Sequence, residues 1–457
     1  MAKKKDLSAS PFVPAEEQPH PIPENWCWVK LSALSSTISK GTTPTGGKDA
    51  YVDTGINFVR VENLNDDGTI SHENIAHITE NVHTGFLKRS ILQENDILIS
   101  IAGTLGKTGI VRDVDLPLNT NQALAFVRIA SQKISRKYIK NAINSTIVQE
   151  VLLSKTKVTS IPNLTLEIIS NCPIPLAPVS EQQRIVDRIE SLFAKLDEAK
   201  EKAQAVVDGF ELRKSAILHK AFTGELTERW RKEHGVGLDS WEVKSLIEVA
   251  SLQTGLMKGK HYEGKTVFLP YLRVANVQDG FLDLTEIKEI EVSPSNVARY
   301  SLKRGDVLFT EGGDFDKLGR GTVWEEEIPN CLHQNHIFVV RPDESVLNSY
   351  FLSYQAGSKY GKEYFLSCSK QTTNLASINS MQLKGFPVKL PSLAEQIEIV
   401  STISNLLDLE RQAKEAAETV LDQIDTMKKA ILARAFRGEL GTNDPSEEWA
   451  GTLVKLI

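Results

Sequence analysis

The chain has 457 residues, of which 41% are hydrophobic and 25% charged, and this composition excludes a fibrous or intrinsically disordered protein. A net charge of −6 gives no general attraction to nucleic acid, so any DNA contact has to come from local basic patches. No apolar run approaches the roughly eighteen residues of a membrane span, and the N-terminus carries no apolar signal segment. We therefore expect a cytoplasmic protein without a membrane partner.

The first element in chain order is an N-terminal tail over residues 1–24, followed by a domain over residues 25–178. Short apolar runs in this domain, such as GINFVRV and DILISIAG, alternate with glycine, asparagine and aspartate turns and predict strands. Tyrosine and apolar residues at helical spacing predict a helix near Arg136–Leu153. The segment has the size of one mixed α/β domain.

A long helix is predicted next, over residues 179–222. It follows the proline-rich stop PIPLAPVS, and Ser180 followed by Gln183 has the spacing of a capping box. Apolar residues then alternate four and three apart for about five heptads, interrupted only by Arg213. The seam positions that begin this pattern are Ile185, Ile189, Leu192 and Leu196.

The same order of elements returns after a linker at residues 223–237. A second domain is predicted over 238–391, with the strand-like runs DVLFTEGG and HIFVVRP and a helix near Val346–Leu366. A second long helix covers 392–436, with a capping box at Ser392 and Glu395 and a seam interrupted by Glu410, and a C-terminal tail covers 437–457. Its first seam positions are Ile399, Ile403 and Leu406.

The two helices are predicted to pack on each other as an antiparallel coiled coil. A narrow seam with alanines favours this arrangement over the alternative, in which each helix packs on its own domain. Forty helical residues make a rod of about 60 Å, more than the roughly 34 Å of one DNA turn. The predicted fold class is α+β, with two tandem domains, each followed by a long helix.

The second half of the chain repeats the first. FVRVEN matches YLRVAN 213 residues later, and KSAILHKAFTGEL matches KKAILARAFRGEL 214 residues later. PVSEQQRIV and PSLAEQIEIV are also 214 residues apart, whereas the domains between these anchors are less similar. This distribution is expected if the helix ends build one frame and the domains bind different targets. The alternative is an old duplication that is retained for folding alone.

Four catalytic or metal-binding motifs are absent or incomplete in this sequence. GTLGKTG places two residues too few between its glycines for a phosphate loop, and the chain lacks the Pro-Pro pair of an adenine methyltransferase tetrapeptide. His333 and His336 have no carboxylate or cysteine at a matching spacing, and the four cysteines form no CxxC pair. We expect no catalytic residue, metal site or cofactor in this chain.

The repeated domain followed by a P-x-x-EQ helix and an A-I-L-x-x-A-F-x-G-E-L ending resembles the specificity subunit of type I restriction-modification enzymes, from about residue 23 to 440. The resemblance implies two target-recognition domains that read a split site in double-stranded DNA, with the helices fixing the unread gap. It also implies two methyltransferase subunits and restriction subunits as partners. S-adenosylmethionine, ATP and magnesium would be bound by those partners, and target adenines would be flipped out for methylation.

Base reading requires Arg, Lys, Asn or Gln side chains in polar loops, and phosphate contacts require Lys, Arg or hydroxyl groups. The first-domain candidates are Lys40, Thr42, Thr43, Lys48, Lys107, Asn119, Asn121, Gln122, Lys155 and Lys157. The second-domain candidates are Lys258, Lys260, Lys317, Arg320, His333, Gln334, Asn335, Lys370 and Gln371. Each alone is equally well explained as a solvated surface residue, and only their clustering indicates DNA contact.

Two alternatives remain at this point. Arg60 and Arg273, with Asn63 and Asn276 three residues on, occupy matching positions in strand-like segments and could form a structural ion pair common to both copies. The whole chain could also be a coiled-coil interaction scaffold without DNA readout, which the acidic net charge slightly favours. A strong salt dependence of DNA binding by the assembled complex would decide between scaffold and DNA reader.

Overall fold

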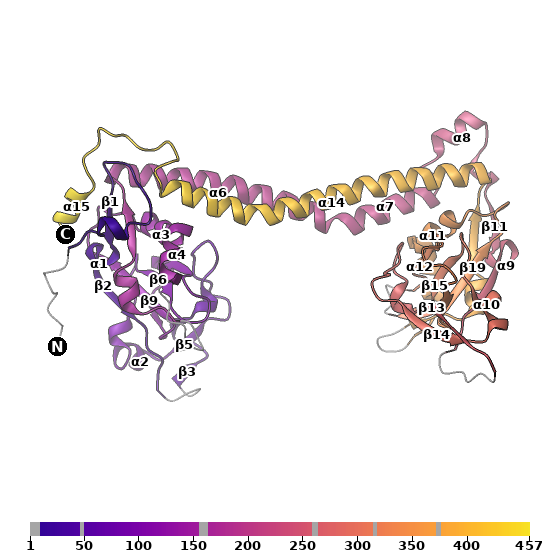
Figure 1. Cartoon of the computed structure of the whole chain (residues 1–457), viewed down its shortest axis with the longest axis horizontal. Helices are drawn as coiled ribbons and strands as arrows, with labels where there is room; N and C mark the ends of the chain where they lie inside the picture. The colour runs from indigo at the N-terminus through magenta and orange to yellow at the C-terminus, as the bar shows by residue number, and fades with distance from the viewer. Residues whose placement is uncertain (1–9, 46–49, 155–162, 258–263, 314–317, 372–375) are drawn as a thin grey trace. The chain divides into compact units, whose positions relative to one another are not determined.

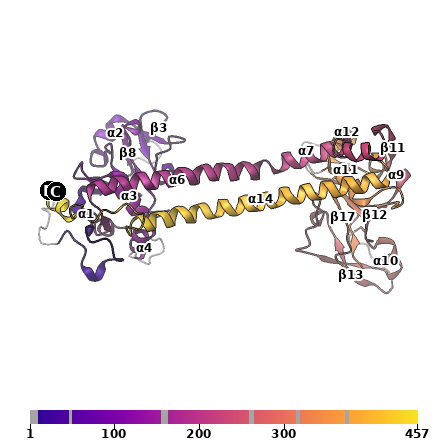
Figure 2. The same cartoon turned by 90° about the horizontal axis from the view of Figure 1, so that it is seen from above.

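A computed structural model describes residues 10–45, 50–154, 163–257, 264–313, 318–371 and 376–457. The chain divides into two compact units. Unit 1 comprises Met1–Lys202 and Thr419–Ile457, and unit 2 comprises Ala203–Glu418. Each unit therefore contains one sheet domain, the beginning of the long helix that follows it, and the end of the other long helix (Figures 1 and 2).

The sheets of unit 1 are short and mostly antiparallel. One four-stranded sheet has the order β2 (Ser35–Lys40), β9 (Leu124–Ile129), β6 (Ile97–Ser100), β7 (Thr108–Ile110). The other has the order β3 (Tyr51–Val52), β5 (Ala76–Ile78), β4 (Ile56–Val59), β8 (Leu118–Thr120), with β4 and β8 parallel. A separate antiparallel pair joins β1 (Cys27–Lys30) to β10 (Pro173–Leu176).

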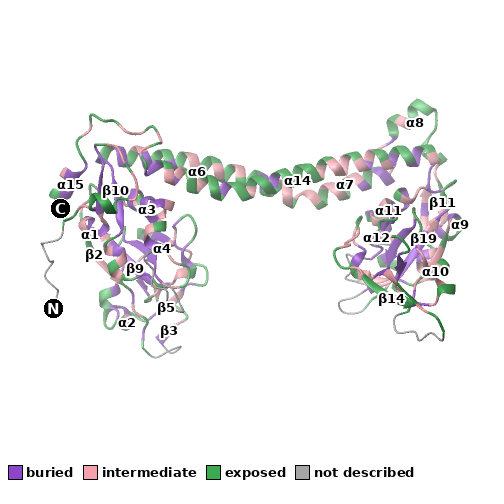
Figure 3. Ribbon diagram, in the orientation of Figure 1, coloured by how far each residue is buried: buried purple, intermediate pink, exposed green. Residues whose placement is uncertain are grey.

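Helices cover the β1–β10 side of unit 1. They are α1 (Leu31–Leu34), α3 (Arg136–Asn144), α4 (Thr146–Ser154), α5 (Leu166–Ser170), the first part of α6 (Val179–Asp208) and α15 (Gly451–Lys455), with the last part of α14 (Leu393–Ala435). Helix α2 (Glu80–Thr84) instead packs against the β3–β5–β4–β8 sheet, where Val82 contacts the cluster of Phe58, Ile78 and Leu87. Tyr138 of α3 is fully buried, donates to the carbonyl of Pro175 at 2.5 Å and meets the ring of Phe436 edge-on at 5.2 Å. The helix ends are thus part of the core of unit 1 (Figure 3).

Unit 2 repeats this topology. Its four-stranded sheet has the order β12 (Ala250–Thr254), β19 (Ile337–Pro342), β15 (Val307–Thr310), β17 (Gly321–Val323). A three-stranded sheet has the order β14 (Lys288–Val292), β13 (Val267–Leu272), β18 (Leu332–His333), and β11 (Glu242–Ser245) pairs with β22 (Pro387–Leu390). A small sheet of β16 (Gly312–Gly313), β21 (Ala376–Ser377) and β20 (Lys370–Gln371) has no counterpart among the described strands of unit 1.

The helices of unit 2 follow those of unit 1 in order. They are the end of α6, α7 (Phe210–Phe222), α8 (Glu228–His234), α9 (Leu246–Val249), α10 (Pro294–Tyr300), α11 (Ser349–Gly357), α12 (Lys359–Cys368), α13 (Ser380–Lys384) and the start of α14. The helices predicted near Arg136–Leu153 and Val346–Leu366 are each two consecutive helices, α3–α4 and α11–α12. Among the described residues, no helix is long and apolar enough to cross a bilayer.

A buried ion pair joins equivalent strands in the two units. In unit 1, Arg128 donates from Nε and Nη2 to the two carboxylate oxygens of Asp96, at 2.8 and 2.7 Å. In unit 2, Arg341 makes the same bidentate contact with Asp306, at 2.7 Å for both bonds. Both aspartates are fully buried. Because such a pair fixes two atoms on each side, it holds the central strands in one register.

The repeated R-V-x-N segment is a structural turn. Buried Asn63 accepts a hydrogen bond from the backbone N–H of Arg60, and buried Asn276 accepts one from Arg273, both at 2.9 Å. Arg60 pairs with Glu62 at 3.6 Å and Arg273 with Glu286 at 3.2 Å, two acids at different positions, so these ion pairs are not common to both copies. Local turn chemistry therefore accounts for this part of the repeat.

The helices pack on each other in antiparallel fashion in both units, which confirms the prediction from the seam. In unit 1, Lys428 of α14 bonds Asp197 of α6 at 2.5 Å. In unit 2, Arg213 of α7 bonds Glu410 of α14 at 2.5 Å, so the two polar interruptions of the seam meet each other. The positions Ile185, Ile189, Ile399 and Ile403 are buried, and Leu192, Leu196 and Leu406 are half-buried.

The first long helix is not continuous. The sequence predicts one helix over 179–222, but α6 ends at Asp208 and α7 begins at Phe210. A Cβ at the intervening Gly209 would lie 2.3 Å from the guanidinium of Arg213. The glycine thus leaves room for the arginine that pairs across the seam, whereas α14 runs unbroken over 43 residues.

The first predicted capping box is wrong, and the second is only half formed. Helix α6 begins at Val179, so Ser180 lies in its first turn, where its hydroxyl bonds Glu447. Gln183 bonds Asp187 at 2.7 Å. The hydroxyl of Ser392 does accept the N–H of Glu395 at 3.3 Å, but the carboxylate of that glutamate turns into the interior. Tertiary partners override the local capping chemistry.

Candidate nucleic-acid interface

Two loops meet at one end of the β2–β9–β6–β7 sheet of unit 1. The loop after β2 begins with Gly41, whose N–H donates to Leu124 at 3.0 Å, and Thr42 donates to the carbonyl of Thr120 at 3.1 Å. A Cβ at Gly41 would lie 2.2 Å from the carbonyl oxygens of Thr120 and Asn121. Only glycine permits this approach, which holds the β2 loop against the turn between β8 and β9.

Side chains of these two loops form one polar cluster. The hydroxyl of Thr43 donates to the side-chain oxygen of Gln122, and both residues are exposed. Asn121 is half-buried and accepts the N–H of Ala123 at 3.0 Å. Lys40 is exposed at the end of β2. Hydroxyl, amide and ammonium groups on one surface are the groups that bind base edges and phosphates.

Unit 2 builds the same junction from different side chains. A Cβ at Gly255 would lie 2.2 Å from the carbonyl oxygen of His333, and Leu256 donates to that carbonyl at 2.9 Å. Gln334 and Asn335 are half-buried in the adjoining turn. The backbone arrangement is thus repeated, while the threonines and glutamine of unit 1 are replaced.

The small third sheet adds exposed groups to this end of unit 2. Lys370 and Gln371 are exposed on β20, which pairs with β21. Strand β21 pairs in turn with β16, and Ile378 donates to the carbonyl of Glu311 at 2.8 Å. Glu311 also contacts His336 of the β18–β19 turn. The predicted Lys370 and Gln371 therefore lie on a sheet that is joined to the same turn.

Two predicted contact residues are buried. Asn119 is fully buried and donates to the carbonyl of Leu87 at 3.2 Å. His333 is 1% exposed, its Nδ1 lies 3.1 Å from the carbonyl of Ile337, and burial lowers its pKa to about 4. Both side chains bond to backbone carbonyls inside the domain, so we leave them out of the interface.

Lys107 and Arg320 occupy equivalent positions. The N–H of Ser100 donates to the carbonyl of Lys107 at 2.8 Å, and that of Thr310 donates to Arg320 at 3.1 Å. The Lys107 ammonium bonds Asp66 at 3.0 Å, and the Arg320 guanidinium bonds Gln278 at 2.9 Å. Each cation is held by a hairpin of its own unit.

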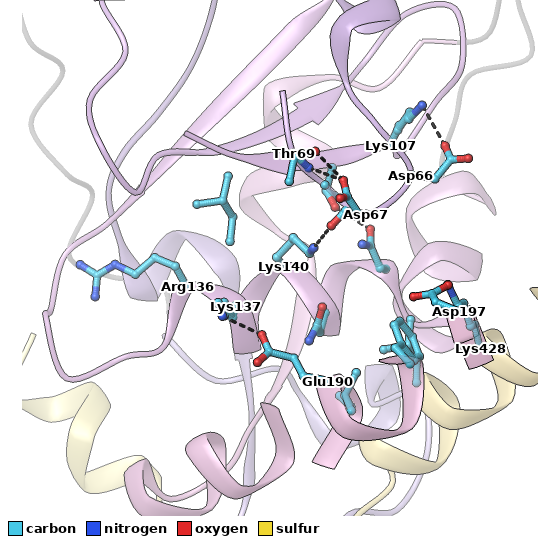
Figure 4. A pocket seen from close by; sticks show the side chains of 18 of the residues that line it. Asp66, Asp67, Thr69, Lys107, Arg136, Lys137, Lys140, Glu190, Asp197 and Lys428 are labelled. Carbon is cyan, nitrogen blue, oxygen red and sulfur yellow. Dashed lines mark hydrogen bonds and ion pairs between the residues drawn. The ribbon is translucent and has the colours of Figure 1, made fainter. Parts of the chain in front are cut away.

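Lys107 lies in a groove of unit 1 of about 1200 Å³, between its sheet domain and its helix ends. Figure 4 shows that many cations of this groove face acids of the same chain. Lys137 bonds Glu190 at 2.7 Å, and Lys140 donates to the carbonyl of Asp67 at 2.7 Å. Burial lowers the pKa of the Lys140 ammonium. Mixed charge distinguishes the groove from the polar loop cluster.

Several predicted candidates lie outside the described residues: Lys48, Lys155, Lys157, Lys258, Lys260 and Lys317. The sequence analysis missed Arg89, whose guanidinium donates to the hydroxyl of Thr42 at 3.3 Å. The signal was available, because the F-L-K-R stretch combines an aromatic residue with two cations. No group of three potential metal ligands occurs among the described residues.

The chain matches the family described as the type I restriction modification DNA specificity domain over residues 23–207 and 239–419. It is 25% identical over 427 residues to the EcoKI specificity subunit of Escherichia coli K12, covering 92% of this chain and 90% of that protein. It is 31% identical over 337 residues to the EcoBI specificity subunit of Escherichia coli, covering 71% and 70%.

The fold also resembles a solved structure, the HsdS subunit from Thermoanaerobacter tengcongensis. The TM-score is 0.64 at 20% sequence identity, and the match covers 93% of this chain and all of that one. The chain belongs to the type I restriction-modification specificity family. It is a specificity subunit, the non-catalytic DNA-recognition component of a type I complex.

Proposed function

We propose that each unit reads one half of a split DNA target through the loops that meet at Gly41 in unit 1 and at Gly255 in unit 2. The observation that carries this assignment is the contrast between backbone and side chains at the two junctions. The same close approach of glycine to a carbonyl recurs, while Thr43 is replaced by Met257, and Asn121 and Gln122 are replaced by Gln334 and Asn335. A repeated scaffold with exchanged polar groups suits two different base sequences.

The partners follow from membership of the family. We propose that the complex contains two methyltransferase subunits and restriction subunits, which bind S-adenosylmethionine, ATP and magnesium. These groups and a genomic target would be available in the cytoplasm. The competing function, a scaffold that does not read DNA, predicts no effect of the loop side chains on target choice.

The test is to express the chain with its methyltransferase subunit and to map methylated adenines across the host genome by single-molecule sequencing. The expected result is one motif with two specified blocks and a fixed gap. A double variant T43A/Q122A should relax or abolish only the block read by unit 1, and Q334A/N335A only the block read by unit 2. Lys232→Ala, on the exposed face of α8, is the matched control. Methylation that is unchanged in both loop variants would contradict the assignment.

A further inference from the structure

Unit 1 carries an insertion beside its polar loop cluster. Sixteen residues separate Thr79 from Asp96, whereas twelve separate the equivalent Ser293 from Asp306. In both units the segment follows a strand and begins with a short helix, α2 or α10. In unit 1 the chain then adds a turn at Phe86 and a one-turn 3-10 helix over Lys88–Ser90. The four additional residues make this segment of unit 1 different from the equivalent segment of unit 2.

Two buried residues, Leu87 and Ser90, anchor the insertion to the interior of the domain. Leu87 is fully buried, donates its N–H to Val82 at 2.9 Å and accepts the Asn119 side chain at 3.2 Å. Ser90 is fully buried and donates its hydroxyl to the carbonyl of Leu87 at 3.0 Å. Lys88 and Arg89 lie between these anchors and Phe86 directly precedes Leu87, so all three exposed residues stand on a fixed support, which reduces the entropy lost on binding.

The outer face of the insertion combines an aromatic ring with two cations. Phe86 is 56% exposed, and Lys88 and Arg89 are exposed next to it. The guanidinium of Arg89 donates to the hydroxyl of Thr42 at 3.3 Å, so the insertion is continuous with the cluster of Thr42, Thr43 and Gln122. A single exposed aromatic is ordinary for a protein surface. A supported ring beside two cations and base-reading groups is suited to nucleic acid.

We propose that Phe86 is a DNA contact of unit 1 that stacks on or inserts between bases, while Arg89 and Lys88 bind the flanking phosphates. The inference rests on the proposed function, because it adds a contact to the same half-site. Proteins use apolar side chains as wedges at base steps and aromatic rings as stacking platforms, and cations nearby hold the backbone. The cations and the adjoining polar cluster favour DNA over a partner protein as the occupant.

The test uses the assembled complex with its methyltransferase subunit and a duplex that carries the target mapped for the wild type. Phe86→Ala should weaken binding of this duplex about tenfold, in line with the contribution of one stacked aromatic. Phe86→Tyr should bind as the wild type does, because a ring is retained. In addition, 2-aminopurine placed in the unit 1 block, at positions other than the methylated adenine, should brighten on binding of the wild type and not of Phe86→Ala.

Arg89→Ala should lower the slope of log K against log salt by about one, as expected for one lost phosphate contact. The matched control is Phe281→Ala, which removes an equally exposed ring, 60% exposed, from a hairpin of unit 2. It should leave both binding and fluorescence unchanged.

Three outcomes separate this inference from the proposed function. Unaltered affinity and fluorescence in Phe86→Ala, together with a changed unit 1 block in T43A/Q122A, would overturn the inference alone. Loss of the methyltransferase subunit from purified Phe86→Ala would also overturn it, since the ring would then be a protein contact. If neither Phe86→Ala nor T43A/Q122A alters target binding or methylation, the proposed function fails as well.

Discussion

Each unit contains a buried glutamate at an equivalent position, and the two glutamates have different partners. In unit 1, Glu181 of α6 accepts the indole N–H of Trp26 at 2.7 Å and the amide of Asn443 at 2.9 Å. In unit 2, Glu395 of α14 accepts the indole N–H of Trp241 at 3.0 Å but pairs with the guanidinium of Arg231 at 2.7 Å. The position and the tryptophan are repeated, whereas the other partner is neutral Asn443 in unit 1 and charged Arg231 in unit 2.

The two units also differ in how the segment that supplies this partner is attached to the sheet domain. In both, the last partner of the glutamate comes from the segment that follows the end of the opposing helix. In unit 2 that segment, which includes Thr227 and Arg231, continues covalently into β11. In unit 1 it is the C-terminal segment, where Arg184 binds Glu447 at 2.8 Å and Ala450 donates to Asn25 at 2.9 Å. The equivalent segment is therefore covalently continuous with the sheet domain in unit 2, whereas in unit 1 it is held against the sheet domain by packing.

The largest effect is expected from removing residues 443–457. This deletion exposes the apolar groups that bury Leu453 and Val454 and removes the stacking of Trp449 on Phe12. At about 1.5–3 kcal/mol for each buried apolar side chain, unit 1 should lose about 4–6 kcal/mol. Hydrogen exchange of the full chain, followed by mass spectrometry, should show faster exchange in unit 1 alone. An equal increase of the exchange rate in unit 2 would contradict the conclusion that the C-terminal segment stabilises unit 1 by packing on it.

The next effect compares the two glutamates. Glu395→Gln leaves the guanidinium of Arg231, which is only 8% exposed, without its carboxylate. Breaking a buried pair in this way costs about 3–5 kcal/mol, whereas Glu181→Gln changes hydrogen bonds to neutral donors and should cost about 1–3 kcal/mol. Hydrogen exchange measured separately for each unit tests the order. A larger loss in Glu181→Gln than in Glu395→Gln would show that the charged partner is not what distinguishes the units.

The frame of both units could be predicted from sequence because its signals are periodic. The seam predicted that Ile185 and Ile399 are buried, and it marked Arg213 and Glu410 as exceptions. That the two exceptions bind each other could not be derived, because a single helix does not reveal the register of its neighbour. The break at Gly209 was not predicted, because a glycine inside a helical pattern is often tolerated.

The interface was predicted less completely, because loop composition does not report burial. Asn119 in β8 and Gln122 in the turn that follows are similar residues, but the first is buried and the second exposed. The deciding contacts come from distant segments, such as the carbonyl of Leu87 for Asn119 and the hydroxyl of Thr43 for Gln122. The F-L-K-R stretch marks Arg89 as a candidate contact, but only the tertiary structure shows that it is joined to the cluster.

His333 offers a comparison at one equivalent position, where unit 1 has the fully buried Thr120 bonded to the carbonyl of Val59 at 3.0 Å. Burial lowers the pKa of His333 from 6.5 to about 4. Between these values the unfolded chain binds the proton that the folded unit excludes, so stability falls as the pH drops from 6.5 to 4. The loss in unit 2 should be about 3 kcal/mol.

The measurement for His333 is hydrogen exchange of unit 2 at pH 7 and pH 4.5, corrected for the intrinsic exchange rate. His333→Thr, which copies the side chain of unit 1, should cost some stability at pH 7 because it is smaller. It should also remove most of the acid sensitivity of unit 2. An unchanged acid sensitivity in this variant would assign the effect to other groups.

The smallest effect is expected at the seam, where Arg213 and Glu410 are 36% and 24% exposed. Arg213→Glu places two carboxylates together and should destabilise the paired helices of unit 2 by about 1–2 kcal/mol. The double variant R213E/E410R restores opposite charges and should recover most of this loss, as measured by exchange in α7 and α14. Lys202→Glu, in an exposed pair with Glu198, is the control and should change little. Failure of the double variant to recover would mean that Gly209 accommodates only a guanidinium at position 213, and that the seam is fixed by shape rather than by charge.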